Sequence, residues 1–103
     1  MSRVRLPDRR PHELRDFQFR GHRYTIGVGK YDDGTLAEIF IDCDKASSPV
    51  ADDGRDAAIC LSIALQHGVD PAVIRAAVTR EENGSPSGIV GAALDLIMEG
   101  DRP

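Results

Sequence analysis

The sequence contains no tryptophan, two cysteines and only 5% aromatic residues. The cysteines, Cys43 and Cys60, are too few for a disulfide framework, and their spacing matches no zinc-binding pattern. We therefore expect reduced, partly buried thiols. No apolar run approaches the ~20 residues of a membrane-spanning helix, and no apolar stretch of a signal peptide follows the basic residues 1–10. These absences predict a cytoplasmic protein with no membrane partner.

The length of 103 residues suffices for one domain and is too short for two. Residues 1–13 contain two prolines among charged neighbours and show no hydrophobic periodicity. We expect this stretch to be a flexible, basic lead-in, and residues 14–100 to form a single domain.

The net charge of −4 is distributed unevenly. Residues 1–23 hold seven Arg against three acidic residues, which gives +4, whereas residues 24–103 hold six Lys or Arg against fourteen Asp or Glu, which gives −8. The basic arm could contact phosphates or an acidic partner, fold back on the acidic body, or remain a solvated linker. Nucleic-acid contact would use Arg3, Arg5, Arg9 and Arg10. The acidic body disfavours that alternative, because it repels phosphates.

Alternating apolar residues predict three strands in the first half of the domain. Residues 15–31 alternate across a turn at Gly21-His22, which predicts two strands. Asp33-Gly34 predicts a second hairpin with a type I′ turn, because glycine adopts the required positive φ without steric cost. The pairs that follow are Val28 with Ile39, Ile26 with Ile41, Gly27 with Phe40, and Gly29 with Glu38. One face of this hairpin is therefore apolar.

The second half has helical periodicity. Asp52 or Asp53 is the predicted N-cap of a first helix, which ends before Gly68. Because only Ser62 is polar between residues 57 and 65, we expect this helix to be buried on all sides.

Two further helices follow. Asp70 caps the second helix, with Pro71 at its first position. Its predicted apolar stripe is Val73, Ile74, Ala77 and Val78. Residues 80–88 are predicted to form a loop. A third helix is predicted to begin at Ser87 and to end at Gly100.

These elements predict an α+β fold, in which a three-stranded antiparallel sheet is followed by three helices packed on one face. The first and third helices carry more apolar surface than one thin sheet covers. We therefore expect a homodimer.

Read together, "YTIGVGKYDDGTLAEIFID", "DK" and "DAAICLSIALQHGVD" resemble the small domain near the C-terminus of adenosylcobalamin-dependent (class II) ribonucleotide reductases, the TSCPD domain family. The family pattern has a Thr-hydrophobic-Gly strand, an Asp-Gly turn, Gly-Glu-Ile-Phe-Ile, a Lys-x-Gly-Ser loop and a Ser-Leu-Ala-Leu-Gln-x-Gly-Val helix. "RLPDRR" at residues 5–10 is similar to the linker that enters that domain. The resemblance covers residues 5–99.

The sequence departs from this pattern at several points. Ala37 stands where the family has glycine, Ala46 replaces the glycine of the loop after Lys45, and the Thr-Ser-Cys-Pro-Asp run is absent. "SSPV" at residues 47–50 lacks the thiol, so no metal or redox role of that cysteine carries over.

The resemblance implies a ribonucleotide-reductase-related accessory domain, here free-standing and not catalytic by itself. Reduction of a ribonucleotide in that family needs a thiyl-forming cysteine, two reducing cysteines, a barrel and a cobalamin site, which Cys43 and Cys60 cannot supply. We expect no catalytic residue, no cofactor and no metal. The expected partner is a ribonucleotide reductase or another protein.

Three residues are candidate contacts to a ligand or partner, namely Glu38, Lys45 and Ser47. Glu38 interrupts an apolar strand, and the family pattern also has Glu there. It could instead form a salt bridge with Lys30 or Arg23. A small-ligand or nucleotide-binding regulatory domain that uses these three residues is the alternative to an interaction domain.

A metal site is a weaker candidate. Carboxylate, thiolate and imidazole suit zinc, and such a site would need Asp42, Cys43, Asp44 and His67 to meet. No short-range ligand spacing supports it, and a cation before Gly68 is already explained by the helix dipole.

Overall fold

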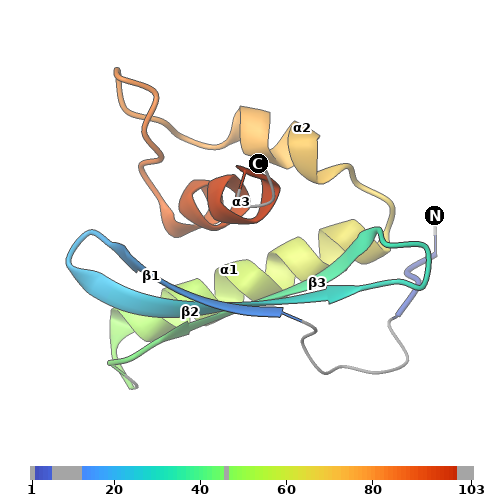
Figure 1. The fold of residues 1–103 in the computed structure, drawn as a ribbon, viewed down its shortest axis with the longest axis horizontal. Helices are drawn as coiled ribbons and strands as arrows, with labels where there is room; N and C mark the ends of the chain where they lie inside the picture. Colours follow the sequence, from blue (N-terminus) through green and yellow to red (C-terminus); the bar gives the residue numbers. More distant parts are fainter. Residues whose placement is uncertain (1, 6–12, 46, 100–103) are drawn as a thin grey trace.

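The computed structural model describes residues 2–5, 13–45 and 47–99, and it has the predicted α+β fold (Figure 1). Three antiparallel strands in the order β1-β2-β3 are followed by three helices. The strands are β1 (Glu13–Phe19), β2 (His22–Lys30) and β3 (Leu36–Cys43), and the helices are α1 (Pro49–Gln66), α2 (Pro71–Ala77) and α3 (Ile89–Glu99). None of these helices is long and apolar enough to cross a membrane.

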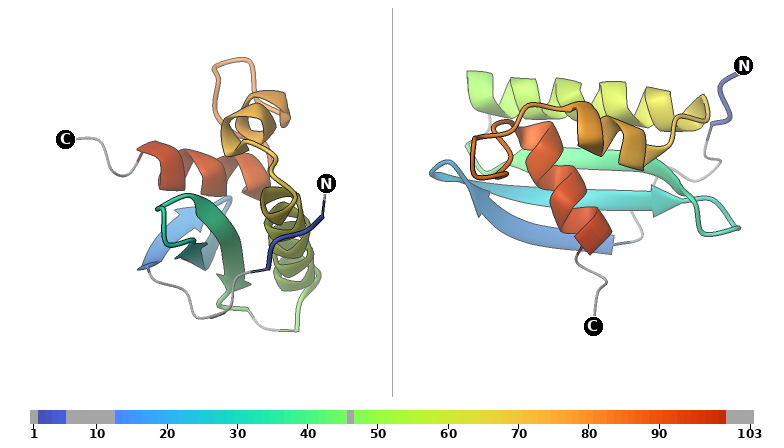
Figure 2. Two further views of the ribbon diagram at one scale, coloured as in Figure 1. Left: turned by 90° about the vertical axis from the view of Figure 1, so that its right-hand side faces the viewer. Right: turned by 90° about the horizontal axis from the view of Figure 1, so that it is seen from above.

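Helices α1 and α3 cover one side of the curved sheet (Figure 2). Helix α1 lies along β3, and α3 crosses nearer β1, where Arg15 donates to the carbonyl of Leu96. The largest fully buried side chains come from β2, β3 and α3: Ile26, Ile39, Ile41 and Leu94. The predicted apolar face of the hairpin is therefore the floor of the core.

The first hairpin turns one residue earlier than predicted. Phe19 pairs with His22, so the turn residues are Arg20 and Gly21, with φ of 49° and 80°. Positive φ at both central residues is the geometry of a type I′ turn, which matches the twist of the two strands. The predicted turn at Gly21-His22 was wrong because the alternation alone left the strand ends undefined.

The second hairpin has the predicted register and a different turn. All four predicted pairs are present. The amide of Gly34 donates to the carbonyl of Tyr31, and the register shifts so that Lys30 pairs with Leu36. Gly34, with φ of 89°, therefore follows the turn as a bulge residue, and the predicted type I′ turn was wrong.

Helix α1 starts earlier than predicted. Its N-cap is Ser48, whose hydroxyl accepts from the amide of Ala51, and Pro49 is the first helical residue. The predicted caps Asp52 and Asp53 lie inside the helix. The predicted stop is confirmed, since Gly68 has a φ of 90°.

One side of α1 faces solvent, which contradicts the prediction of a helix buried on all sides. Ile59 is 52% exposed and Ile63 is 37% exposed, and Cys60 is exposed as well. The opposite side packs on β3 so closely that a Cβ added to Gly54 would lie 3.2 Å from the Cγ2 atom of Ile41.

Helix α2 is capped by Asp70 as predicted. Two of the four residues of its predicted apolar stripe, however, are exposed to solvent. Ile74 packs against the core, whereas Val73 is 62% exposed and Ala77 is also exposed. Helix α3 begins at Ile89, two residues after the predicted start at Ser87, and extends to Glu99. The predicted stop at Gly100 lies outside the described residues.

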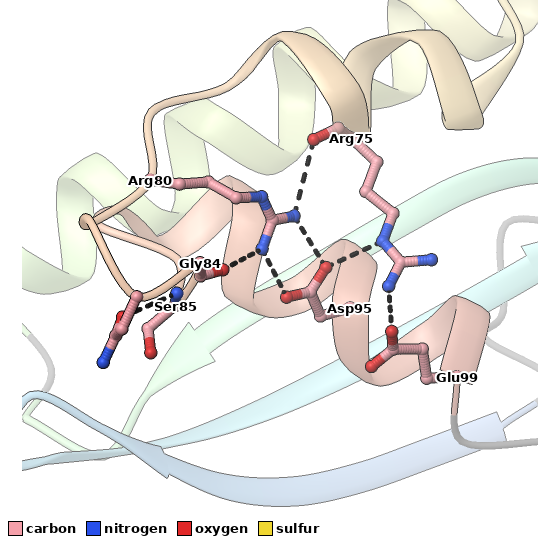
Figure 3. A network of polar contacts seen from close by, with 7 residues as sticks. Arg75, Arg80, Gly84, Ser85, Asp95 and Glu99 are labelled. Carbon is pink, nitrogen blue, oxygen red and sulfur yellow. Dashed lines mark hydrogen bonds and ion pairs between the residues drawn. The ribbon is translucent and has the colours of Figure 1, made fainter.

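A polar network joins α2, the following loop and α3 (Figure 3). Arg80 donates to both carboxylate oxygens of Asp95 at 2.8 Å, and the Nε atom of Arg75 donates to one of them at 2.8 Å. Arg75 also pairs with Glu99. The hydrogen bonds from the two guanidinium groups lower the pKa of Asp95 to about 2, against partial burial. The network holds α2, whose own residues are all at least partly exposed.

We predict that Asp95→Asn destabilises the protein by about 1–2 kcal/mol at neutral pH. The folded-state pKa lies below the ordinary value of 3.8, so this stabilisation is present above about pH 4 and is lost as the pH falls toward the folded pKa. Urea unfolding should show the largest difference from the unmodified protein at pH 7 and a shrinking one in acid. Asp53→Asn, at an exposed position of α1, is the matched control. A difference that stays constant down to about pH 2.5 would contradict the linkage.

Candidate functional site

Glu38 is a buried carboxylate between β3 and α1. It lies opposite Gly29, is 2% exposed, and accepts a hydrogen bond of 3.2 Å from the Nε2 atom of Gln66. Lys30 pairs with Glu13 instead, at 3.5 Å, and Arg23 is exposed. The predicted salt bridge between Glu38 and Lys30 or Arg23 is therefore wrong, and the amide of Gln66 is one partner of this carboxylate.

Gln66 connects this carboxylate to the N-terminal segment. Its Nε2 atom also donates to the carbonyl of Ala37 at 3.2 Å, and its Oε1 atom accepts from the Nε atom of Arg3 at 2.5 Å. The backbone carbonyl of Gln66 accepts from the amide of Val4 at 2.8 Å, and the hydroxyl of Tyr31 donates to the carbonyl of Val4. The N-terminal segment consequently lies beside the end of α1 (Figure 2).

Sequence reasoning missed Gln66 as a functional residue. A glutamine near a helix end is ordinarily exposed, and its contacts lie 28 residues away or more. The available signal was Ser62, four residues earlier on the same helical face. The hydroxyl of Ser62 accepts from the amide of Ile39 and donates to its carbonyl, so both polar residues of this face meet the edge of β3.

Lys45 and Ser47 lie at the other end of β3 from Glu38. They belong to the exposed loop that leads into α1, where the carbonyl of Lys45 accepts from the hydroxyl of Ser48. The strand continues from Glu38 to Cys43 before the loop with Lys45 begins, and this length of strand alone corresponds to roughly 17 Å. The structure therefore does not bring the three predicted contact residues together.

Ser47 has a left-handed backbone, with φ of 64°. When the Lys-x-Gly-Ser pattern is aligned on Lys45 and the capping Ser48, its glycine falls on Ser47 and not on Ala46, which lies outside the described residues. Glycine suits this position because it adopts positive φ without a steric penalty. This finding corrects the alignment of the loop and gives Ser47 a conformational role.

The residues of the candidate zinc site are far apart. Asp42, Cys43 and Asp44 lie at the end of β3, beside the start of α1, whereas His67 follows the opposite end of that helix. In the described ranges no three His, Cys, Asp or Glu side chains are grouped so that they could hold a metal ion. Cys43 is buried and Cys60 is exposed, and both are free thiols. The expected partial burial therefore does not hold for Cys60.

Two hollows in the surface lie beside Gln66 and Glu38. The larger, which we call the end groove, measures about 730 Å³ and lies where the β2–β3 turn, the N-terminal segment and the junction between α1 and α2 meet. Its lining residues include Val4, Tyr31, Asp33, Leu36, Leu65, Val69, Asp70 and Pro71. The smaller measures about 220 Å³, lies between β3 and the outer side of α1, and includes Glu38 and Arg3 in its lining.

Comparisons with known proteins identify relatives of the chain. Three of them are vitamin B12-dependent ribonucleotide reductases. The protein of Bradyrhizobium diazoefficiens is 37% identical over 87 residues, which is 82% of this chain. The proteins of Rhodopirellula baltica and Agrobacterium fabrum are 39% and 34% identical over 72 and 68 residues, which are 70% and 66% of this chain. The chain spans only 5–7% of the length of these relatives. No family model and no solved structure matches it.

We predict that Gln66→Ala destabilises the fold by about 2–3 kcal/mol, because it leaves buried acceptors without their donor. It should also weaken the docking of residues 2–5, which amide hydrogen exchange at Val4 would detect. Gln18→Ala, at an exposed position of β1, should change the free energy of unfolding by less than about 0.5 kcal/mol. Equal stability of the two variants would show that Gln66 does not hold this site together.

We predict that Ser47→Gly, in contrast to Gln66→Ala, stabilises the protein. A non-glycine residue in the left-handed region costs about 1 kcal/mol, so glycine should stabilise the protein by up to about that amount, less the entropy that it adds to the unfolded chain. Thermal and urea unfolding would measure the change. Ser87→Gly, at a position without positive φ, is the control and should not stabilise. A Ser47→Gly variant destabilised by about 1 kcal/mol or more would indicate that the serine side chain matters more than the backbone.

Proposed function

Because the chain is a domain related to a segment of vitamin B12-dependent ribonucleotide reductases, we propose that it is a non-catalytic accessory domain that binds a protein partner. A B12-dependent reductase is the partner that we test first. The observation that carries this proposal is the match to 82% of this chain and to only 7% of the Bradyrhizobium relative. A segment of that size contributes one module to a much larger enzyme.

The free thiols support a role outside the chemistry. Reduction of a ribonucleotide by cysteines requires thiols that can approach each other and the substrate. Cys43 is 8% exposed and belongs to β3, whereas Cys60 lies on the exposed side of α1. The most buried carboxylate of the described residues, Glu38, is engaged by Gln66 in holding α1 to the sheet. Glu38 therefore serves the fold, and the two thiols lie on different elements.

We further propose that the domain is of the TSCPD type and acts in the cytoplasm. The hairpin register and the capped loop after Lys45 support the TSCPD type, because the motifs of the family pattern follow one another along a single strand-turn-strand-helix unit. The homodimer also stays a proposal. Its support is the pair of exposed isoleucines one turn apart on α1, Ile59 and Ile63.

The two alternatives have less support. Glu38 lies apart from Lys45 and Ser47, so one small ligand or nucleotide would not contact all three residues. For nucleic-acid contact, Arg3 is already bound to Gln66, and the net charge of −4 disfavours phosphates. Of the other three arginines, Arg5 is exposed, and Arg9 and Arg10 lie outside the described residues. We therefore favour a protein partner.

We predict that the purified full chain binds a B12-dependent ribonucleotide reductase from the same organism with a dissociation constant of about 10 μM or tighter. Biolayer interferometry would measure the affinity, and light scattering of the chain alone would distinguish a monomer from a homodimer. Incubated alone with adenosylcobalamin and a ribonucleotide, the chain should produce no deoxyribonucleotide.

Lysozyme, a basic protein, immobilised at the same density is the control for nonspecific attraction of the acidic body. The absence of binding at about 100 μM chain would remove the reductase as the partner. Deoxyribonucleotide formed by the chain alone would refute the non-catalytic role.

A further inference from the structure

The end groove lies where the N-terminal segment, the β2–β3 turn and the junction between α1 and α2 meet at one end of the molecule (Figure 1). Its apolar lining includes Leu36 from β3, Leu65 from α1, Val69 from the connection between α1 and α2, and Pro71 at the start of α2. A volume of about 730 Å³ lies within the range of sites that bind small molecules or several side chains of a peptide. The groove therefore has room and apolar surface for an occupant.

The rim of the end groove is acidic. Asp33 lies on one side, where hydrogen bonds from the hydroxyl and amide of Thr35 lower the pKa of its carboxyl group. Asp70 lies on the other side and caps α2 through the amide of Ala72. Both carboxylates are exposed and carry charge at neutral pH.

The C-terminal end of α1 adds to this negative potential. The helix has 18 residues, and its last turn contains no Lys or Arg, with only His67 at the cap. The partial negative charge of the carbonyl end favours a cation nearby. Arg3 already lies at this helix end, so the charge that remains to favour a cationic occupant is that of the two exposed carboxylates.

The N-terminal segment of the chain shows how a backbone is recognised here. Val4 is held at both of its backbone polar groups, by the carbonyl of Gln66 and the hydroxyl of Tyr31. Arg3 and Arg5 flank it, and Arg3 donates to the side chain of Gln66. The side chain of Val4 is 60% exposed, so this segment borders the groove without filling it. An extended, basic and aliphatic stretch is therefore already compatible with this end of the molecule.

We propose that the end groove binds an extended peptide segment of a protein partner in which Arg or Lys alternates with aliphatic residues, laid beside residues 2–5. The aliphatic side chains would contact Leu65 and Val69, and the cations would face Asp33 and Asp70. This inference rests on the proposed function as an interaction domain, and it names the surface and the chemistry of the partner.

The test uses the full chain and a defined probe, a fluorescent Arg-Val-Arg-Leu-Arg peptide. Fluorescence anisotropy should give saturable binding that weakens as salt rises. Amide shifts of the ¹⁵N-labelled chain should concentrate at Leu36, Gly68 and Val69. A Glu-Val-Glu-Leu-Glu peptide should not bind, and an Arg-Ser-Arg-Ser-Arg peptide should bind at least about tenfold more weakly, because it loses the apolar contacts.

Asp70→Asn is the decisive variant, because asparagine caps a helix as well as aspartate and removes only the charge. It should weaken peptide binding about three- to tenfold, whereas Asp53→Asn near the far end of α1 should leave it within about twofold. No saturable binding, equal binding of both variants, or shifts centred away from the groove would overturn the inference. If the chain binds the reductase but not the peptide, the end groove is not a peptide site and the proposed function still holds. If it binds the peptide but not the reductase, the peptide site holds and the reductase is not the partner.

Discussion

The contact between α1 and the free edge of β3 is the constraint on which the rest of the structure depends. A three-stranded sheet presents unpaired amides and carbonyls at its edges, and such edges invite pairing with other chains. Here Ser62 bonds both backbone groups of Ile39, and Gln66 bonds the carbonyl of Ala37. Two polar side chains one helical turn apart thus satisfy alternate residues of the strand. The contact fixes the position of α1 along the sheet. It thereby places the C-terminal end of the helix beside the N-terminal segment.

Much of the fold follows from local patterns in the sequence. The register of β2 and β3 was predictable because a slip of one residue would have moved Ile39 and Ile41 to the wrong face of the sheet. The type of turn was not predictable in this way, because a glycine after Asp33 fits either the turn itself or the bulge that follows it. The start of α1 depended on Ser48 and Pro49, which define a stronger cap together than either nearby aspartate does.

The candidate site was less accessible from the sequence. Glu38 could be singled out because a carboxylate interrupts an apolar strand, but its contact with Gln66 exists only once the helix lies against the sheet. The exposed side of α1 was missed for a related reason. A helix that is apolar nearly all round carries no periodic signal for the face that packs, and the small residue Gly54 decides it through close approach to Ile41. In the loop before α1, Ser47 was predicted to contact a ligand or partner. Its side chain gave no sign that its backbone has left-handed geometry.

The same contact also separates the parts of the molecule that maintain the fold from those that can bind. Glu38, Ser62 and Gln66 are buried at 9% exposure or less, and their hydrogen bonds hold α1 against β3. Residues used in this way cannot move toward a substrate without opening the edge of the sheet. The charged groups at the end of α1 are under no such constraint, because Asp33 and Asp70 are held by local turns and caps and still face solvent. This arrangement gives the domain a rigid core and a negatively charged, partly apolar end. Both properties suit the protein-binding role that we propose, and that role requires no reactive group.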